Sequence, residues 1–416
     1  MSVLGPPVYE EETALNLPFI VEEEAKRSFD FFWKEANTNP ESPGYGLILD
    51  NTGNKKVASI ASVGFGLSAI IIGIERGWIT KEEGYERTKG TLETFLHNVE
   101  HVGGFFYHFL NMETAKKYEE FYDCASIIDT SLFLNGAITS AEYFGGEIAD
   151  LFEKIYARVD WDMYYDKSVN QFYMGYNLET GGFHHWDMYA EQMMQYILGV
   201  ASETHPVPVE IYQGFERRLG EYGGYEFYNS PGGCLFTHQF SHAWFDFAKY
   251  RDSDGIDWFE NSVKASKASR QYSIDQKDNF KTYHENSWGL TACATPNGYG
   301  GPGTPPYHPN VNPVNDGTVP PAGAIGSIVF TPEESIAAME YYYENHPQLW
   351  GEYGFQDAYN LDVTPPWYAD HVIGIDKGIS LLMIENYRSG LVWDLYMKNK
   401  YVQRGIELLG WKKVEK

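Results

Sequence analysis

A single carboxylate set among aromatic and histidine side chains is the feature of this chain that could do chemistry. Glu191 lies in the segment GGFHHWDMYAEQMMQY (181–196), close to Trp186 and Tyr189. Flat aromatic rings pack against the C–H faces of sugars, and a carboxylic acid in such surroundings can protonate a leaving oxygen. The segment therefore indicates general acid chemistry on a sugar. A buried aromatic core whose acid is satisfied by a neighbour would have the same residue types.

The spacing around Glu191 predicts a helix over 185–202. Asp187, Glu191 and Gln195 recur every four residues and would share one face of that helix. Two like charges at this spacing are mildly unfavourable, which favours a face that lines a polar cleft over a solvated outer face.

Asp129 is a second acid in an unusual setting. It stands in the apolar run SIIDTSLF (126–133), where an ionised carboxylate needs a hydrogen-bonding partner or a cavity. Asp123, a few residues earlier, is predicted to cap the helix that follows, over 123–144.

Motifs for metal or nucleophilic chemistry are weak. His238 and His242 are four residues apart in THQFSHAW, but no glutamate stands between them as in zinc proteases. The segment RDSDGID (251–257) has the wrong continuation for a calcium loop and predicts a helix-capping turn. The chain contains neither GxSxG nor a P-loop. We therefore predict no metal site and no organic cofactor.

Composition narrows the class of partner. The 416 residues carry a formal net charge of −27, which disfavours nucleic acid and anionic membrane surfaces and suits a neutral ligand. Aromatic residues reach 16%, as carbohydrate-binding proteins often need, although a Tyr-rich core would also give this value. No stretch approaches the roughly 18 apolar residues of a membrane span. The three cysteines, Cys124, Cys234 and Cys293, form no CxxC pair.

Helices dominate the predicted secondary structure. Periodicity and capping residues predict helices near 19–35, 58–76, 80–99, 123–144, 147–158, 185–202, 237–250, 255–272, 285–294, 331–345, 375–388 and 392–409. Thr331, Pro332 and Glu334 predict a capping box at one start. Short strands are expected near 105–109, 171–177 and 224–228. Twelve helices with long loops, such as 295–323, favour an all-α fold, an (α/α)6 toroid of six helical hairpins with rim loops, over an α-solenoid.

Many segments, in order along the chain, resemble the bacterial glucoamylase-like family that contains endo-β-1,2-glucanases and a domain of cyclic β-1,2-glucan synthases. The resembling segments include GGFFYHF (103–109), SIIDTSLFLNGAITSAEYF (126–144), YAEQ (189–192), SETHPVP (202–208), THQFSHAWFDF (237–247), DGTVPPAGAIGS (316–327), FTPEES (330–335), WGEYGFQDAYN (350–360), GIDKG (374–378) and LMIENYRSGLVW (382–393). The resemblance implies an (α/α)6 toroid that cleaves β-linked glucan with inversion. We expect one catalytic domain over 58–416, with residues 1–57 forming an N-terminal segment and first helix packed on it.

The resemblance also implies site residues. Glu191 matches the acid of the family's Y-S-E-Y motif, and the second catalytic acid is one of Asp357, Asp376, Asp129 and Asp123. The expected sugar-contacting residues are His108, Trp186, Tyr189, His238, His242, Trp244, Trp288, Tyr299, Asp316 and Trp367. We expect the cleft where 104–108, 185–196, 238–244 and 295–323 converge. One position departs from the family: where its members carry a glutamate two residues before the serine of S-x-I-D-T, this chain has Cys124.

Three functions stay open on the sequence. The leading hypothesis is a hydrolase of β-1,2-glucan or its oligosaccharides; the others are a β-glucan transglycosylase and a sugar-binding homologue impaired by Cys124. The expected partner is a neutral carbohydrate, with no nucleic acid, no membrane insertion and no obligate protein partner. The first residues, MSVLGPPVYEEE, have no signal-peptide pattern. The protein is expected in the cytoplasm if this start is native, or, by resemblance, in the periplasm or secreted if a signal was removed.

Overall fold

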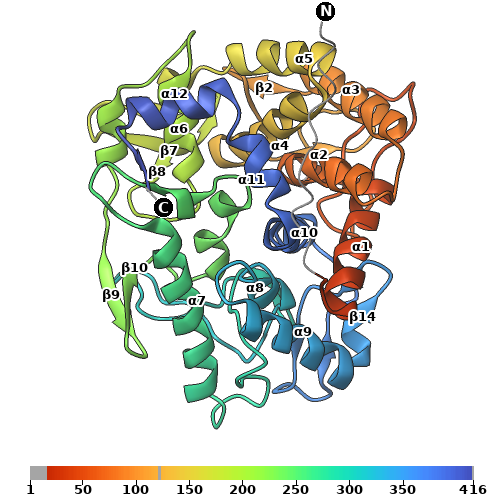
Figure 1. Cartoon of the computed structure of the whole chain (residues 1–416), viewed down its shortest axis with the longest axis vertical. Coiled ribbons are helices and arrows are strands. Elements are labelled where there is room, and N and C mark those ends of the chain that lie inside the picture. The colour runs from red at the N-terminus through yellow and green to blue at the C-terminus, as the bar shows by residue number, and fades with distance from the viewer. Residues whose placement is uncertain (1–15, 120–122, 415–416) are drawn as a thin grey trace, which may run out of the picture.

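The computed structural model describes residues 16–119 and 123–414 (Figure 1). Within these ranges most of the regular structure is helical, and the strands are short. The α-helices are α1 (Phe19–Lys34), α2 (Ile60–Glu75), α3 (Lys81–His97), α4 (Ile127–Phe144), α5 (Gly146–Ala157), α6 (Met193–Ala201), α7 (Trp258–Asp275), α8 (Pro321–Ile325), α9 (Pro332–Asn345), α10 (Gly374–Ser389), α11 (Leu391–Tyr396) and α12 (Lys400–Leu408).

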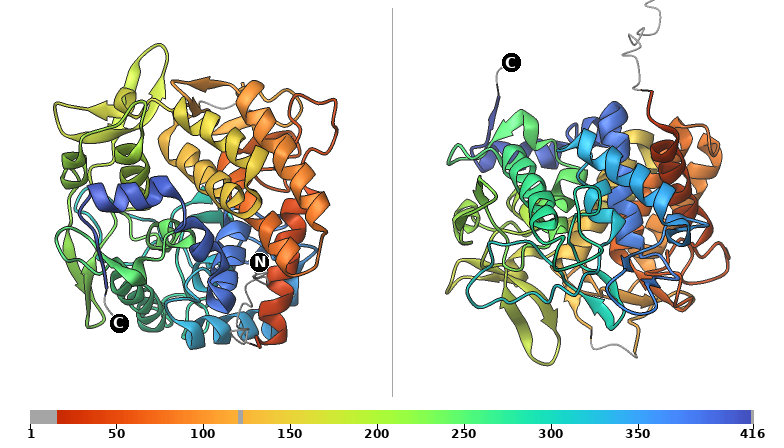
Figure 2. Two further views of the ribbon diagram at one scale, coloured as in Figure 1. Left: turned by 45° about the horizontal axis from the view of Figure 1, so that its top comes forward. Right: turned by 90° about the horizontal axis from the view of Figure 1, so that it is seen from below.

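The strands form small antiparallel pairs. They are β1 (Val57–Ser59), β2 (His101–Val102), β3 (Phe105–Phe106), β4 (Phe109–Asn111), β5 (Ala125–Ser126), β6 (Tyr165–Asp166), β7 (Gln171–Asn177), β8 (Gly181–His185), β9 (Leu219–Tyr222), β10 (Tyr225–Tyr228), β11 (Tyr250–Arg251), β12 (Cys293–Thr295), β13 (Gly298–Gly300), β14 (Trp350–Gly351), β15 (Gly354–Phe355), β16 (Tyr359–Asn360), β17 (Trp367–Tyr368) and β18 (Lys412–Lys413). The largest sheet has four strands and joins β5, β6, β7 and β8. In Figure 2 most hairpins and long loops lie toward one side, from which the β7–β8 hairpin projects.

The helices α2 and α4 cross at the centre of the hydrophobic core. Fourteen of the sixteen residues of α2 are buried, so this helix has no solvated face and is covered all round. The crossing needs glycine, because a Cβ atom on Gly64 would lie 2.3 Å from the carbonyl oxygen of Leu132. A Cβ atom on Gly136 would lie 2.0 Å from the carbonyl oxygen of Gly64.

Contacts between helices run in a circuit. Helix α2 packs on α4, α4 on α6, α8 on α10, and α10 on α2. The segment 235–243, which forms two short 3-10 helices, connects α6 to α8. Its Ser241 hydroxyl donates to the carbonyl of Glu191 at 2.6 Å, and its Gln239 amide donates to the carbonyl of Gly323 at 2.8 Å. Figure 1 shows α10 near the middle of the molecule with α1 and α2 beside it.

Other helices pack outside this circuit. Helix α1 contacts α2, α9 and α10, α3 contacts α5, α9 contacts α8, and α12 contacts α6. No helix in the described part of the chain is both long enough and apolar enough to cross a bilayer.

Several predicted elements are correct, and four helix predictions are wrong. Helices α1, α2, α3, α4, α5, α7, α9 and α10 lie within a few residues of their predicted ranges, and strands β7 and β10 match theirs. The predicted helix over 185–202 begins only at Met193, because 181–185 pairs as β8 with β7. Residues 237–250 form 3-10 turns, residues 285–294 form no helix, and the predicted helix over 392–409 is divided into α11 and α12.

Two capping predictions are also wrong. Ser126, not Asp123, caps α4, because its side chain accepts from the N–H of Asp129 at 3.2 Å. Thr331 precedes α9 but makes no capping bond; its hydroxyl donates instead to the carbonyl of Ser327 at 3.3 Å. The turn predicted in 251–257 is confirmed, since Asp257 caps α7.

Candidate active site

A cavity of about 430 Å³ lies where four distant parts of the chain meet. They are the segment before β1, the start of β4, the β12–β13 hairpin and the start of α10. The lining residues are Asp50, Asn51, His108, Phe109, Ala294, Thr295, Gly298, Tyr299, His371, Ile373 and Ile375. The main chain fixes this junction, because the N–H of Gly374 donates to the carbonyl of Asp50 at 2.7 Å.

Asp50 is the carboxyl group that lines the cavity directly. Burial raises its pKa, a hydrogen bond from Asn51 at 2.8 Å lowers it, and the charge of Asp129 raises it further. His108 and His371 favour the ionised form when they are charged. Asp50, Asn51 and His371 were not among the predicted site residues.

Asp129 and Asp123 lie beside the cavity at the start of α4. Asp129 accepts from the Ser126 hydroxyl, and its Oδ1 lies 3.5 Å from Nε2 of His108. Asp123 accepts from the N–H groups of Phe109 at 2.9 Å and Cys124 at 2.8 Å, while burial raises its pKa. The expectation that Asp129 needs a partner or a cavity is therefore confirmed.

Glu191 lies in the turn before α6. Burial raises its pKa to about 7, and the charge of Asp129 raises it in addition. Because the helix begins at Met193, the expected common face does not form: Asp187 is exposed and Gln195 is buried. Glu191 nevertheless has the property that an acid catalyst needs near neutral pH, a proton that is held but can be released.

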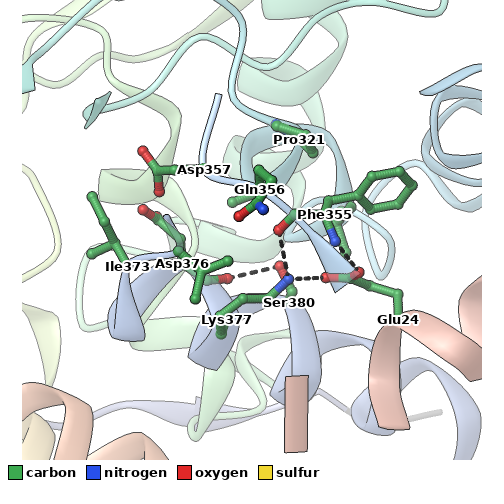
Figure 3. A pocket seen from close by; sticks show the side chains of 12 residues that line it. Glu24, Pro321, Phe355, Gln356, Asp357, Ile373, Asp376, Lys377 and Ser380 are labelled. Carbon is green, nitrogen blue, oxygen red and sulfur yellow. Dashed lines mark hydrogen bonds and ion pairs between the residues drawn. The ribbon is translucent and has the colours of Figure 1, made fainter. Parts of the chain in front are cut away.

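Asp357 and Asp376 form a buried pair (Figure 3). Asp376 stands in the first turn of α10, and Asp357 follows β15. Asp357 Oδ2 accepts from the N–H of Ala294, a cavity residue, at 2.6 Å. Burial raises the pKa of both acids, and the charge of Asp357 raises that of Asp376 further. Two buried carboxyl groups that interact in this way do not both ionise easily.

These acids belong to one electrostatic group. The charge of Asp50 raises the pKa of Asp376, and the charge of Asp129 raises the pKa values of Asp50 and Glu191. Carboxyl groups whose surroundings give them different protonation states can divide the roles of acid and base, as hydrolysis of a glycosidic bond requires.

Of the predicted sugar-contacting residues, His108 and Tyr299 line this cavity. The Tyr299 side chain is 65% exposed, which is unusual for so large an apolar ring. Asp316 accepts from the N–H of Thr318 at 3.0 Å, and Trp367 pairs with Asn360 between β17 and β16; neither lines the cavity.

The remaining predicted contacts are buried and do not line this cavity. They are Trp186, Tyr189, His238, His242, Trp244 and Trp288. Tyr189 stacks on Trp258 with ring centroids 4.5 Å apart, and the Trp244 indole donates to Ser68 at 2.9 Å. Burial lowers the pKa of both His238 and His242 to about 3, so both rings are neutral near pH 7.

Cys124 is half-buried beside Asp123 and Asp129. Burial and these two charges raise the pKa of its thiol to about 12. A Cβ atom on Gly175 would lie 2.6 Å from Cys124 Sγ and 2.8 Å from the ring of Phe183, so the β7–β8 hairpin packs closely on the thiol. In residues 16–119 and 123–414, no group of three or more His, Cys, Asp and Glu side chains could hold a metal ion.

Known proteins resemble this chain over most of its length. The family described as "Glycoamylase: Putative glucoamylase" matches residues 183–400. An exo β-1,2-glucooligosaccharide sophorohydrolase (non-reducing end) of Parabacteroides distasonis is 30% identical over 419 residues, which cover 91% of this chain and 56% of that protein. The chain thus spans little more than half the length of that relative.

Two solved structures have similar folds and related names. The endo-β-1,2-glucanase of Chitinophaga pinensis, solved with sophorotriose and glucose, is 29% identical with a TM-score of 0.84, over 94% of this chain and 98% of that one. The β-1,2-glucanase of Parabacteroides distasonis is 28% identical with a TM-score of 0.84, over 94% of this chain and 59% of that one. With its family match extending over half of its residues, this chain belongs to the glucoamylase-like family that has endo-β-1,2-glucanase and sophorohydrolase relatives.

Proposed function

We propose that this protein is a glycoside hydrolase that cleaves β-1,2-linked glucan or its oligosaccharides. The observation that carries the proposal is a cavity of about 430 Å³ that Asp50 lines and at whose wall Asp357 accepts from Ala294. These acids interact electrostatically with Asp376, and Asp50 and Glu191 both interact with Asp129. The volume falls in the range of small-molecule sites. The names of the similar proteins, which act on β-1,2-glucan or its oligosaccharides, support this substrate.

Glu191 is the proposed general acid. Its surroundings raise its pKa to about 7, so a substantial part of the protein carries this proton at neutral pH. In glycoside hydrolysis the acid protonates the leaving oxygen as the bond to the anomeric carbon breaks. A glutamate with an ordinary pKa would be almost fully ionised under the same conditions.

Asp357 is the proposed base that activates water. The N–H of Ala294 fixes one of its oxygens, and Asp376 can hold the proton of the pair, which leaves Asp357 as the carboxylate. Asp123 and Asp129 accept hydrogen bonds around the start of α4, which supports a role in holding His108 and the cavity wall. The reaction is then an inversion at the anomeric carbon.

The proposed architecture is an (α/α)6 toroid with one catalytic domain over 58–416, on which the first helix packs. The circuit of contacts through α2, α4, α6, 235–243, α8 and α10 supports this arrangement. His108 and Tyr299 are the proposed sugar contacts at the cavity. Acid and base catalysis by carboxyl groups needs no metal and no organic cofactor.

The test is incubation with linear β-1,2-glucan and with β-1,2-gluco-oligosaccharides of defined length. Starch and β-1,3-glucan serve as matched controls for linkage. We expect shorter linear β-1,2 products, no cleavage of the controls, and the α-anomer as the first product in proton NMR. Cyclic or elongated products would instead identify a transglycosylase, and binding without turnover would identify a sugar-binding protein; either result contradicts the proposal.

A further inference from the structure

The Asp357–Asp376 pair consists of two buried carboxyl groups that face each other. The side chains of both residues are at least 94% buried, with exposed fractions of 4% for Asp357 and 6% for Asp376. One buried oxygen of each residue, Asp357 Oδ1 and Asp376 Oδ2, accepts no hydrogen bond from an N–H or hydroxyl donor among the described residues. The two side chains lie within hydrogen-bonding range of each other and face each other in Figure 3. A carboxyl–carboxyl hydrogen bond requires a proton on one partner.

The neighbouring Lys377 forms its ion pair with Glu24 and not with either aspartate, although its charge lowers the pKa of both. Lys377, the next residue of α10, turns toward Glu24, with Nζ–Oε1 at 2.5 Å, and also donates to the carbonyl of Phe355 at 3.0 Å. The other titratable groups that act on the two aspartates or are acted on by them are Asp50, His371, Cys293 and Tyr299. A shared proton therefore provides the compensation that a salt bridge provides elsewhere.

We propose that Asp376 is a positioning residue, which keeps the proton of the pair and holds the carboxylate of Asp357 in place by donating a hydrogen bond to it. Asp357 then receives two donors, the O–H of Asp376 and the N–H of Ala294. Two donors fix the plane of the carboxylate next to the cavity wall that Ala294 forms. The role of Asp376 in catalysis rests on the proposed function, whereas the shared proton does not.

Two substitutions separate positioning from proton transfer. Asp376→Asn keeps the shape and replaces the O–H donor with an N–H donor, whereas Asp376→Ala removes the donor. We expect Asp376→Asn to keep kcat within about fivefold of the wild type. We expect Asp376→Ala to lower kcat by about 10- to 100-fold with little change in KM, because misplacing a catalytic group by 1 Å can cost about 10²-fold.

Ser380→Ala is the matched control. Ser380 lines the small cavity that Asp357 and Asp376 also line, which is distinct from the 430 Å³ cavity (Figure 3). Its hydroxyl donates to the main-chain carbonyl of Asp376 and not to the carboxyl pair. Its kcat should equal that of the wild type. If Asp376→Asn loses as much activity as Asp376→Ala, Asp376 transfers a proton itself; if neither loses activity, it is only structural. Both results overturn the proposal.

A second measurement tests the shared proton without any substrate. A carboxyl group whose pKa is raised by folding keeps its proton after the unfolded chain has lost it, so stability falls as pH rises above the ordinary aspartate pKa. The Tm of the wild type should therefore fall more between pH 5 and pH 8 than the Tm of Asp376→Asn. Equal falls would overturn the shared proton even if the protein proves inactive on every glucan. The expected difference together with inactivity would leave the proton in place and reject the proposed function.

Discussion

Two buried acid sites lie next to each other beside α10, and they differ in how the buried carboxyl groups are compensated. Glu24 of α1 meets the ammonium group of Lys377, accepts from the N–H of Phe355 at 2.9 Å, and accepts from the Ser28 hydroxyl at 3.1 Å. The adjacent pair, Asp357 and Asp376, forms no ion pair with any of the described residues, and Lys377 turns away from it toward Glu24 (Figure 3). Both sites are buried to a similar degree, so burial alone does not distinguish them.

The presence or absence of an ion pair distinguishes an acid that stabilises the fold, Glu24, from acids that can take part in catalysis. At Glu24 the buried charge is matched by a cation and two hydrogen-bond donors. At Asp357 and Asp376 the compensation is a proton, which is mobile. Glu191, whose pKa burial raises to about 7, also belongs to the acids that can take part in catalysis. This contrast predicts that substitutions at the two kinds of acid affect different measurements.

Glu191→Gln should produce the largest effect. The amide keeps the shape of the side chain but cannot donate a proton to the leaving oxygen, so kcat on β-1,2-glucan should fall by about 10²- to 10⁴-fold. Binding of oligosaccharide, measured by calorimetry, should persist. A variant that retains full activity on the best substrate would show that Glu191 is not the acid.

The pH dependence provides the control for this assignment. Glu191 must be protonated to act, so kcat/KM should fall about tenfold for each pH unit above about 7. Because folding raises this pKa, the wild type should also lose stability as pH rises from about 4.5 to 7, and Glu191→Gln should lack that part of the loss. If the residual kcat/KM of Glu191→Gln still falls above about pH 7, a different group is the acid.

Lys377→Met should reduce stability strongly and change the chemistry only slightly, through the loss of a charge that lowers the pKa of Asp357 and Asp376. It leaves the buried Glu24 without its cation, and breaking a buried pair in this way costs about 3–5 kcal/mol of unfolding free energy. Urea denaturation measures the loss, and Glu24→Gln combined with Lys377→Met should restore much of it. The exposed pair Lys34–Glu352, at 3.5 Å, is the matched control, because Lys34→Met should cost about 1 kcal/mol or less. A fall in activity per folded molecule as large as that of Glu191→Gln would contradict this distinction between structural and catalytic acids.

The sequence predicts local structure well and the site only in part. Helix α3 has a complete capping box at Thr80 and Glu83, and α9 starts at Pro332, so local signals determine where they begin. Residues 185–192 were misassigned as helix; His185 instead ends strand β8, where it lies opposite Tyr173 of β7, a pairing that no local pattern specifies. Residues 237–243 were misassigned because tertiary contacts hold them in 3-10 turns.

The cavity shows why the site was harder to predict. Asp50 follows the apolar, buried run 47–49, just as Asp129 stands in an apolar run. The argument that a carboxylate in such a run needs a partner or a cavity would therefore also have identified Asp50. His371 had no such signal, because backbone hydrogen bonds to distant segments bring it to the cavity, among them Gly374 to Asp50 and the N–H of Asp357 to the carbonyl of His371. The buried tryptophans were predicted as sugar contacts because sequence cannot distinguish a stacking ring from a core ring.

Cys124→Glu should have a smaller and purely unfavourable effect. The thiol packs on Gly175 and Phe183, and a longer carboxylate there would be overpacked and would stand beside the charges of Asp123 and Asp129. We expect a loss of about 1–3 kcal/mol of unfolding free energy and no gain in kcat. Cys124→Ser is the size-matched control. A gain in kcat would show that a carboxylate at this position takes part in catalysis.

Tyr299→Ala should give the smallest effect and tests the cavity itself. The ring is 65% exposed and lines the cavity, so its removal should not disturb the core. A stacked ring contributes about 0.5–1.5 kcal/mol, so KM for β-1,2-gluco-oligosaccharides should rise by about 2- to 10-fold while Tm stays constant. Tyr299→Phe keeps the ring and should keep KM. Trp288→Ala, at a fully buried ring, should instead lose about 3–5 kcal/mol of stability. If Tyr299→Ala leaves KM unchanged, the sugar does not contact this wall of the cavity, and the acids around it would have to act on a substrate bound from another side.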